Sequence, residues 1–358
     1  KYARSVQTDM PGELKGDSVI VSDLREGSQL YSKGNYGYPL SGGGLELDLT
    51  EAVYLAESNR LLVESEGRRV EFDELFAQAS RQNEGFDVKY LVYRDMRSRG
   101  FVVKTETGGF DLSVFPRGKT MSNSRPEYMV RAVSERTVLD ISDFSAEISH
   151  TEIRGRELLY GVADEEGDVT YYKMSMRDPR GSVAASSSGR RVDGVLISDR
   201  VFVFDPEDYG SLKEAGFFGK DIGGALQLSL IESCYLSEKG ILNVLGNDGK
   251  NVGHGDLKRF GAEAQSDFDL RMSAYYDLRS RGLVVKTGFK YGTHFRVYEG
   301  SPDDCHARYL VHAVPASDTA MWPEISRTVR LSGGVKKDIL FCRISGGIEY
   351  LEFKWFRP

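Results

Sequence analysis

Three residues in the C-terminal part of the chain could carry chemistry: Tyr298, His306, and a lysine at Lys336 or Lys337. His306 follows the polar loop Glu299–Cys305, and a histidine at the rim of a sheet can give or take protons near neutral pH. Taken singly, each has an ordinary alternative, because surface histidines, strand-end tyrosines and solvated lysines are common. A comparison within the chain itself sets the three apart.

The chain contains one segment twice. Tyr93–Thr105 reads YRDMRSRGFVVKT and Tyr275–Thr287 reads YYDLRSRGLVVKT, identical at ten of thirteen positions. The match extends upstream, where DSVIVSD at 17–23 pairs with DGVLISD at 193–199. The whole chain is therefore expected to be a tandem duplication.

The two copies differ at the positions that could do chemistry. Tyr298 aligns with Phe115 and His306 with Arg125. The counterpart of Lys337 is Arg156, or Gly155 if the alignment shifts by one residue. A duplication that keeps its scaffold but loses a hydroxyl and an imidazole predicts one active half and one structural half.

The repeats predict the domain organisation. Residues 1–177 form the inactive structural repeat, with sections at about 1–85 and 86–177. Residues 192–358 form the catalytic repeat, with sections at about 192–265 and 266–358. The Pro/Gly/Ser-rich segment 178–191 is expected to be a linker.

The sequence pattern predicts an α/β (mixed α+β) fold. Each repeat would have a small N-terminal α+β section followed by a mixed sheet flanked by helices, as in restriction-endonuclease-like folds. In the first section of copy two we expect a strand at 195–198 and a helix around 228–236. In the second section we expect a helix from about 267, strands at 283–287, 295–298 and 308–314, a helix near 324–331, and strands at 339–344 and 349–356.

Composition narrows the class of protein. The chain has 358 residues, which favours two or more domains, and a net charge of −7, so a nucleic-acid site would have to be a local basic patch. Its three cysteines cannot all pair and show no metal-ligand spacing, which favours a reducing cytoplasm. No apolar run approaches the roughly 18 residues of a membrane span, and no signal peptide is apparent, so we expect a cytoplasmic protein.

The residues resemble a known family, the archaeal tRNA-splicing endonucleases (tRNA-intron endonucleases) in the form that fuses two repeats in one chain. The strongest segments are YYDLRSRGLVVKTGFKYGTHFRVY (275–298), HARYLVHAV (306–314) and TVRLSGGVKKDILF (328–341). The resemblance implies that Tyr298, His306 and Lys337 are catalytic. Lys337 is the second basic residue of the family's Val-Arg-Lys pattern, and register alone favours it over Lys336.

The resemblance also implies the chemistry. RNA supplies its own nucleophile, the ribose 2′-hydroxyl, so the enzyme needs only a base, an acid and a cation. Tyr298 would be the base, His306 the acid and Lys337 the electrostatic clamp. A tyrosine with an unperturbed pKa near 10 needs a nearby cation to act as a base. The products would be a 2′,3′-cyclic phosphate and a 5′-hydroxyl, with no metal and no cofactor.

Two further site groups follow from the same resemblance. Arg330 and Trp355 would clamp a flipped intron base by stacking, although Trp355 is equally expected as a core anchor. The acidic segment Asp164, Glu165, Glu166 and Asp168 lies between two strands of the inactive repeat, where copy two has Ser345-Gly-Gly347. In the family, such a loop docks into a basic pocket of a second chain, which implies a homodimer; otherwise it is a solvated turn.

The resemblance implies excision of introns from precursor tRNA at bulge-helix-bulge junctions, whose bulges expose bases that helices hide. A basic loop at 116–126, with Arg117, Lys119 and Arg125, could broaden that specificity or be an ordinary mobile loop. One rival class is a non-catalytic RNA-binding dimer. Another is a metal-dependent DNA nuclease, which would need acidic residues that the strand 295–298 lacks.

Overall fold

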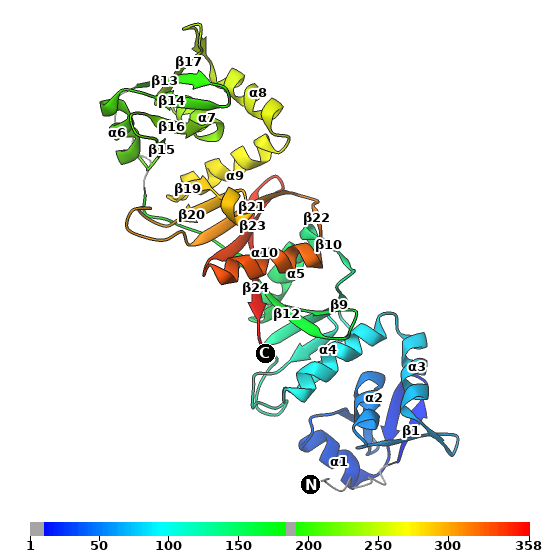
Figure 1. Cartoon of the computed structure of the whole chain (residues 1–358). Helices are drawn as coiled ribbons and strands as arrows, with labels where there is room; N and C mark the ends of the chain where they lie inside the picture. The colour runs from blue at the N-terminus through cyan, green and yellow to red at the C-terminus, as the bar shows by residue number, and fades with distance from the viewer. Residues whose placement is uncertain (1–10, 184–190) are drawn as a thin grey trace, which may run out of the picture.

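The computed structural model describes residues 11–183 and 191–358. Figure 1 shows an elongated molecule to which each repeat contributes an end section and a central section. The first sections lie at the two ends, and the second sections lie next to each other in the middle. The duplication in sequence is therefore also a duplication in structure.

The first section of each repeat is a six-stranded sheet covered by helices. In the first repeat its elements are β1 (Pro11–Lys15), β2 (Ser18–Val21), α1 (Leu24–Ser32), β3 (Tyr38–Pro39), β4 (Leu45–Asp48), α2 (Leu49–Glu57), β5 (Leu62–Ser65), β6 (Arg68–Val70) and α3 (Phe72–Gln82). In the second repeat they are β13 (Val192–Ile197), β14 (Arg200–Val203), α6 (Pro206–Glu214), β15 (Lys220–Asp221), β16 (Leu226–Ser229), α7 (Leu230–Glu238), β17 (Leu242–Leu245), β18 (Asn251–Val252) and α8 (His254–Ala264). The strand orders β3-β4-β2-β1-β5-β6 and β15-β16-β14-β13-β17-β18 are equivalent.

Two predicted ends in this section are wrong. β13 begins before the predicted strand 195–198 and stops at Ile197, because Ser198 takes a left-handed turn conformation with φ 55°. The predicted helix around 228–236 starts too early, because β16 continues to Ser229. Ser229 and Glu232 exchange hydrogen bonds between their side chains and backbone N–H groups, and this capping box fixes the start of α7.

The second section of each repeat is a five-stranded mixed sheet with a long helix on each face. In the first repeat its elements are α4 (Phe86–Ser98), β7 (Val103–Thr105), β8 (Leu112–Val114), β9 (Tyr128–Ser134), β10 (Val138–Asp140), α5 (Ile141–Ile153), β11 (Glu157–Ala163) and β12 (Val169–Arg177). In the second they are α9 (Phe268–Ser280), β19 (Val284–Thr287), the 3₁₀ turn η1 (Phe289–Tyr291), β20 (Phe295–Tyr298), β21 (Tyr309–Pro315), β22 (Thr319–Met321), α10 (Trp322–Gly334), β23 (Asp338–Ile344) and β24 (Ile348–Phe356). The predicted order of elements is confirmed, with η1 and β22 as additions.

The two second sections merge into one continuous sheet, which the sequence did not predict. β12 and β24 pair antiparallel, giving a ten-stranded sheet in the order β19-β20-β21-β23-β24-β12-β11-β9-β8-β7. The short strands β10 and β22 pair with each other as well. Because each repeat would otherwise expose a long apolar edge strand, this pairing removes two edges that could aggregate.

One hydrophobic core spans the join. It contains Phe144 of α5 and Trp322 of α10 together with Tyr172, Leu351 and Phe353 from the two joined strands. α5 and α10 therefore cover the same face of the sheet, one from each repeat. The central part of the molecule is a single packed unit to which both repeats contribute.

The segment that the repeats share has a structural role. Arg97 near the end of α4 and Arg279 near the end of α9 are buried and donate to backbone oxygens of their own first section. Lys104 of β7 donates to Glu51 at 2.5 Å, and burial raises the pKa of that carboxyl to about 7. These contacts lock each first section to its second section, so identity between the copies marks the scaffold.

The predicted linker 178–191 falls partly outside the described residues. Its first part is held against the second repeat: the Gly181 N–H donates to the Arg281 oxygen at 3.0 Å, and the Val183 N–H donates to the Gly282 oxygen at 2.9 Å. Arg281 also pairs with Asp178 at 2.5 Å. Among the helices described, none has the length and apolar character needed to cross a membrane.

Candidate active site

Tyr298 and Lys337 lie on one line across three neighbouring strands. Val297 pairs with Tyr309, Tyr309 pairs with Asp338, and the next step of both registers aligns Tyr298 with Arg308 and Lys337. Hydrogen bonds from the Arg308 N–H to the Val297 oxygen (2.9 Å) and from the Asp338 N–H to the Arg308 oxygen (3.1 Å) extend the ladder to this line. With strands about 4.8 Å apart, the two Cα atoms are about 10 Å apart and their side chains share one face.

That face is the one covered by α10. Arg296, two residues before Tyr298 in β20, pairs with Leu310, and Leu310 packs in the core with Val329 of α10. The Tyr298 ring is mostly buried, against Val284 and Ala307. These neighbouring side chains therefore hold the Tyr298 ring in place.

His306 lies next to this line. A turn closed by hydrogen bonds from the Asp304 and Cys305 N–H groups to the Ser301 oxygen precedes it, and its imidazole is exposed. Its neighbour Ala307 packs in one small buried cluster with Tyr298, so His306 lies close to the tyrosine, in the segment that leads into β21. The structure thus brings together all three residues that the sequence singled out.

The polar groups of Tyr298, His306 and Lys337 form no hydrogen bond or ion pair with the described residues. This holds for the Tyr298 hydroxyl, the His306 imidazole and the Lys337 ammonium across residues 11–183 and 191–358. The Lys337 Nζ lies 5.8 Å from the centre of the Tyr291 ring, a contact that orients a cation without neutralising it. A phenol, an imidazole and an ammonium group at the ends of neighbouring strands are thus available to a ligand.

Backbone conformation and strand register distinguish Lys336 from Lys337. Lys336 adopts a left-handed backbone conformation with φ 54°, and the residue at the same place in the first repeat is Gly155, with φ 65°. The register of β9 and β11, in which Tyr128 pairs with Glu157, makes Arg156 the counterpart of Lys337. Lys336 is therefore the turn residue, and Lys337 is the residue on the line with Tyr298.

Sequence reasoning missed Arg296. Its guanidinium carbon lies 6.0 Å from the centre of the Tyr298 ring, and its Nε is buried without a partner among the described residues. The equivalent residue of the first repeat is Ser113, which is buried. The comparison of copies that singled out Tyr298 could have found this cation too, since an arginine replaced by a serine is as large a change.

Comparison with known proteins agrees with this geometry. A family model described as the tRNA intron endonuclease catalytic C-terminal domain matches residues 86–171 and 268–350, and one described as the tRNA intron endonuclease N-terminal domain matches 10–76 and 192–258. The chain is 36% identical to a tRNA-splicing endonuclease of Methanococcoides burtonii, over 96% of this chain and 98% of that protein. It is 34% identical to a tRNA-splicing endonuclease of Halobacterium salinarum, over 93% and 94%.

The chain belongs to the tRNA intron endonuclease family. Both domains of the family occur twice in it, once in each repeat. This confirms the family and the tandem architecture that the sequence predicted.

Arg330 and Trp355 line one cavity of about 570 Å³ together with Lys337. Trp355 is 45% exposed, so the expectation of a core anchor is wrong; Trp322, which is 1% exposed, has that place. The Arg357 guanidinium carbon lies 4.1 Å from the centre of the Trp355 ring. The indole thus presents a stacking surface next to cationic side chains.

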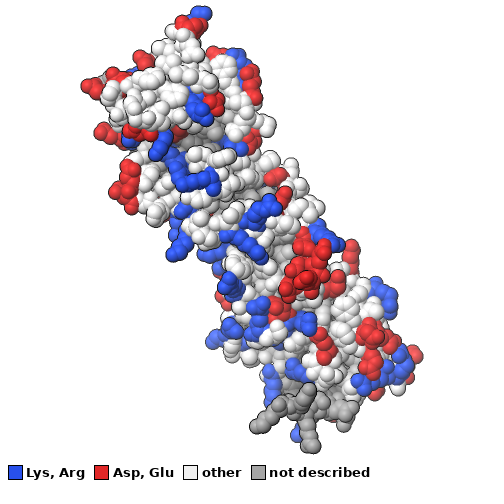
Figure 2. Space-filling view, in the orientation of Figure 1, with Lys and Arg blue, Asp and Glu red and all other residues white. Residues whose placement is uncertain are grey.

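Figure 2 shows basic side chains over β19, β20 and α10, beside a cluster of acidic side chains. The predicted acidic segment connects β11 to β12, and its four carboxylate residues are exposed. Asp164 Oδ1 accepts from the Glu166 and Asp168 N–H groups at 3.0 and 2.9 Å, and Glu165 pairs with Arg136. The chain itself therefore offsets part of the charge that we expected a second chain to neutralise.

The basic loop 116–126 contacts both sections of its own repeat. The Met121 N–H donates to Asn35 Oδ1 at 3.2 Å, and Arg117 donates to the Arg99 oxygen at 3.4 Å. Arg117 also lies over the Phe101 ring, 5.6 Å from its centre.

Proposed function

We propose that this protein excises introns from precursor tRNA by metal-independent RNA cleavage. The observation that carries the proposal is the set Tyr298, His306 and Lys337, which lie at the ends of neighbouring strands in the second repeat and form no hydrogen bond or ion pair with the described residues. Their counterparts in the first repeat are Phe115, Arg125 and Arg156. The names of the relatives, tRNA-splicing endonucleases, supply the substrate class.

Each group has a step in the proposed reaction. The Tyr298 phenolate takes the proton of the ribose 2′-hydroxyl, whose oxygen then attacks the adjacent phosphorus. His306 donates a proton to the 5′-oxygen as its bond to phosphorus breaks. Lys337 stabilises the additional negative charge of the pentavalent transition state, and Arg296 is a second cation beside the tyrosine ring. The products are a 2′,3′-cyclic phosphate and a 5′-hydroxyl.

Recognition would depend on the shape of a bulge-helix-bulge junction. Bulged nucleotides expose base faces that an A-form helix hides, and a cavity that combines Arg330 with a half-exposed Trp355 suits a flipped base. The basic loop 116–126 would add phosphate contacts from the inactive repeat. Residues 192–358 would be the catalytic repeat, and 1–177 its structural partner.

The exposed acidic segment supports a homodimer. After the internal contacts of Asp164 and Glu165, the side chains of Glu166 and Asp168 are the ones left to meet a cationic surface of a second chain. We expect the replacement of Asp164, Glu165, Glu166 and Asp168 by neutral residues to weaken dimerisation and cleavage together, as raised salt would. Light scattering decides the point: a wild-type monomer that cleaves fully at nanomolar concentration would rule out the dimer.

The decisive experiment is cleavage of a precursor tRNA in EDTA with identification of the RNA ends. We expect both splice sites to be cut, cyclic phosphate and 5′-hydroxyl ends to form, and Tyr298→Phe to bind the RNA but not cut it. Binding by the wild-type chain without cleavage would instead establish a non-catalytic RNA-binding scaffold. Cleavage that stops in EDTA and returns with a divalent cation would contradict the proposed chemistry.

A further inference from the structure

The turn η1, which connects β19 to β20 beside the candidate active site, carries an exposed aromatic ring. Phe289 is 88% exposed, and no large apolar side chain within residues 11–183 and 191–358 is more exposed. Its neighbour Lys290 is also exposed and forms no ion pair or hydrogen bond with those residues. Neither side chain packs in the core, so the fold does not depend on them. An aromatic ring and an ammonium group without an anionic partner are thus open to solvent on one turn.

The backbone of this turn is held in place. The Tyr291 N–H donates to the Gly288 oxygen at 2.8 Å, and the Gly288 N–H donates to the His294 oxygen at 3.0 Å. Gly288 leaves no room for a side chain, since a Cβ there would lie 2.4 Å from the Thr293 hydroxyl oxygen. Phe289 is therefore presented by an ordered backbone, which reduces the entropy lost when a ligand binds.

The same turn reaches Lys337 through Tyr291. The Tyr291 ring packs against the core that α10 covers. Two ammonium groups lie near this ring, Lys290 Nζ at 5.2 Å and Lys337 Nζ at 5.8 Å from its centre, so they are at most 11 Å apart. Phe289 precedes Tyr291 by two residues. A phosphate bound by Lys337 would therefore have the next nucleotide of its strand within reach of Lys290 and Phe289.

The first repeat keeps the scaffold of this turn and lacks the exposed pair. The turn between β7 and β8 contains Phe110, which packs in the same core as Tyr291. Before this inward ring, the first repeat has Glu-Thr-Gly-Gly at 106–109, whereas the second has Gly-Phe-Lys at 288–290. The exposed ring and the cation thus occur only in the second repeat, as do the phenol and the imidazole proposed for catalysis.

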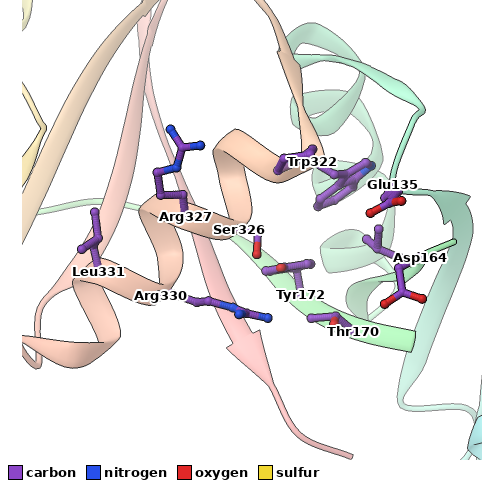
Figure 3. A pocket seen from close by; sticks show the side chains of 11 residues that line it. Glu135, Asp164, Thr170, Tyr172, Trp322, Ser326, Arg327, Arg330 and Leu331 are labelled. Carbon is purple, nitrogen blue, oxygen red and sulfur yellow. The ribbon is translucent and has the colours of Figure 1, made fainter. Parts of the chain in front are cut away.

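The cavity where the two repeats meet has no ring that a base could reach. Figure 3 shows this space of about 590 Å³ between α10 and the β11–β12 hairpin. Trp322 and Tyr172 in its lining are 1% and 3% exposed. The carboxylates of Glu135 and Asp164 also line it and would repel a phosphate. The ring of Phe289, which is exposed and lies next to lysines, meets both requirements that this cavity fails.

We propose that η1 is an RNA-binding turn, in which Phe289 stacks on an unpaired base next to the scissile phosphate and Lys290 binds the adjoining phosphate. Bulged bases have free faces, and aromatic rings stack on any of them. Figure 2 shows basic side chains over β19 and β20, the strands that η1 connects, so this surface favours a polyanion. The stacked base is not the one held by Arg330 and Trp355. This inference rests on the proposed function, because it takes its ligand from the bulge of the precursor.

The test measures equilibrium binding of a bulge-helix-bulge precursor in EDTA by the full-length chain carrying Tyr298→Phe, which leaves the RNA uncut. Phe289→Ala should raise Kd about tenfold, the usual worth of one stacked base. Phe289→Trp should bind like the parent, because an indole also stacks on a base. Ile153→Ala is the matched control, since Ile153 is 87% exposed at the end of α5 in the inactive repeat.

Salt dependence separates the cation from the ring. Lys290→Gln should weaken binding at low salt and reduce the slope of log Kd against log salt concentration by about 0.7 to 1, the value for one phosphate contact. Phe289→Ala should leave this slope unchanged, because a stacked ring releases no counterion. Lys250→Gln is the matched control and should keep the parent's slope, since the Lys250 side chain is 84% exposed at the β17–β18 hairpin.

Abasic substitutions at each unpaired position in turn locate the stacked base. At one position next to the scissile phosphate, the abasic RNA should bind the parent about tenfold more weakly, and Phe289→Ala should add no further loss. Independent losses at every position, or parent affinity in both Phe289→Ala and Lys290→Gln, overturn the inference. So does a Phe289→Ala chain that is monomeric without RNA while the parent is dimeric, because η1 would then bind a second copy of the chain.

The proposed function and the RNA-binding turn fail in different experiments. A wild-type chain that neither binds nor cuts the precursor refutes the proposed function, and this inference with it. A wild-type chain that binds and cuts, and whose turn variants are indistinguishable from the parent, refutes the RNA-binding turn alone. Thermal melting establishes that each variant folds, which we expect because the side chains of Phe289 and Lys290 are exposed.

Discussion

Replacing Trp355 with alanine should separate RNA binding from stability. The side chain is 45% exposed in the last strand and touches Arg357. A fully buried tryptophan costs about 3–5 kcal/mol when truncated to alanine. Because about half of this side chain is exposed, we expect a loss of about 1 kcal/mol in the free energy of unfolding. Loss of one stacked base should cost binding about 1–3 kcal/mol, a rise in Kd of about 5- to 150-fold.

The assay pairs urea unfolding with equilibrium binding of an uncut precursor. Trp355→Arg should restore most of the affinity, because a guanidinium plane also stacks on a base. Met176→Ala is the matched control, since Met176 occupies the equivalent position of β12, where it pairs with Leu351 as Trp355 pairs with Tyr172. Trp322→Ala should show the opposite pattern, a large loss of stability. A collapse of stability in Trp355→Ala with unchanged RNA affinity of the folded fraction would refute the reasoning.

The remaining predictions concern single residues. At saturating RNA, His306→Ala should lower the single-turnover cleavage rate by about 10²–10⁴-fold, whereas Arg125→Ala at the equivalent place should keep its rate. Equal rates for both variants would remove His306 from the mechanism. Lys336→Gly should leave the free energy of unfolding equal to that of the wild type or raise it by up to about 1 kcal/mol, because glycine takes a positive φ without strain, as Gly155 does. A loss of cleavage at saturating RNA would show instead that Lys336 is catalytic. Burial lowers the pKa of His294 to about 3, so between pH 6.5 and 3 the unfolded chain binds a proton that the folded chain excludes, and stability falls as pH falls through 6.5. His294→Asn, a neutral acceptor, should therefore lose about 2 kcal/mol less than wild type between pH 7 and pH 5 in urea unfolding; parallel losses would contradict this.

His312 illustrates a limit of reading residues singly. It follows His306 by six positions and would serve as its control if it were an ordinary strand residue. In the structure it stacks on His294 with ring centres 4.1 Å apart, and burial lowers its pKa. A substitution there would disturb the sheet, so Arg125 is the better control.

The sequence by itself determined the duplication and the order of elements in the second sections, and it singled out Tyr298, His306 and a lysine at Lys336 or Lys337. These are local properties. The strand 295–298 and the helix starting near 267 follow from apolar periodicity and turn residues, which act over a few positions. The loss of Tyr298 and His306 from the first copy is likewise visible in the alignment of the copies alone.

Tertiary structure decided what depends on contacts between distant segments. Only the joined registers place Lys337, rather than Lys336, on the line with Tyr298, and only packing shows Trp355 exposed while Trp322 fills the core. The union of β12 with β24 and the cavity above it depend on which side chains of one repeat meet those of the other. The pairing of β12 with β24 buries the apolar edges of both second sections. The local sequence pattern of either strand contains no information about its partner.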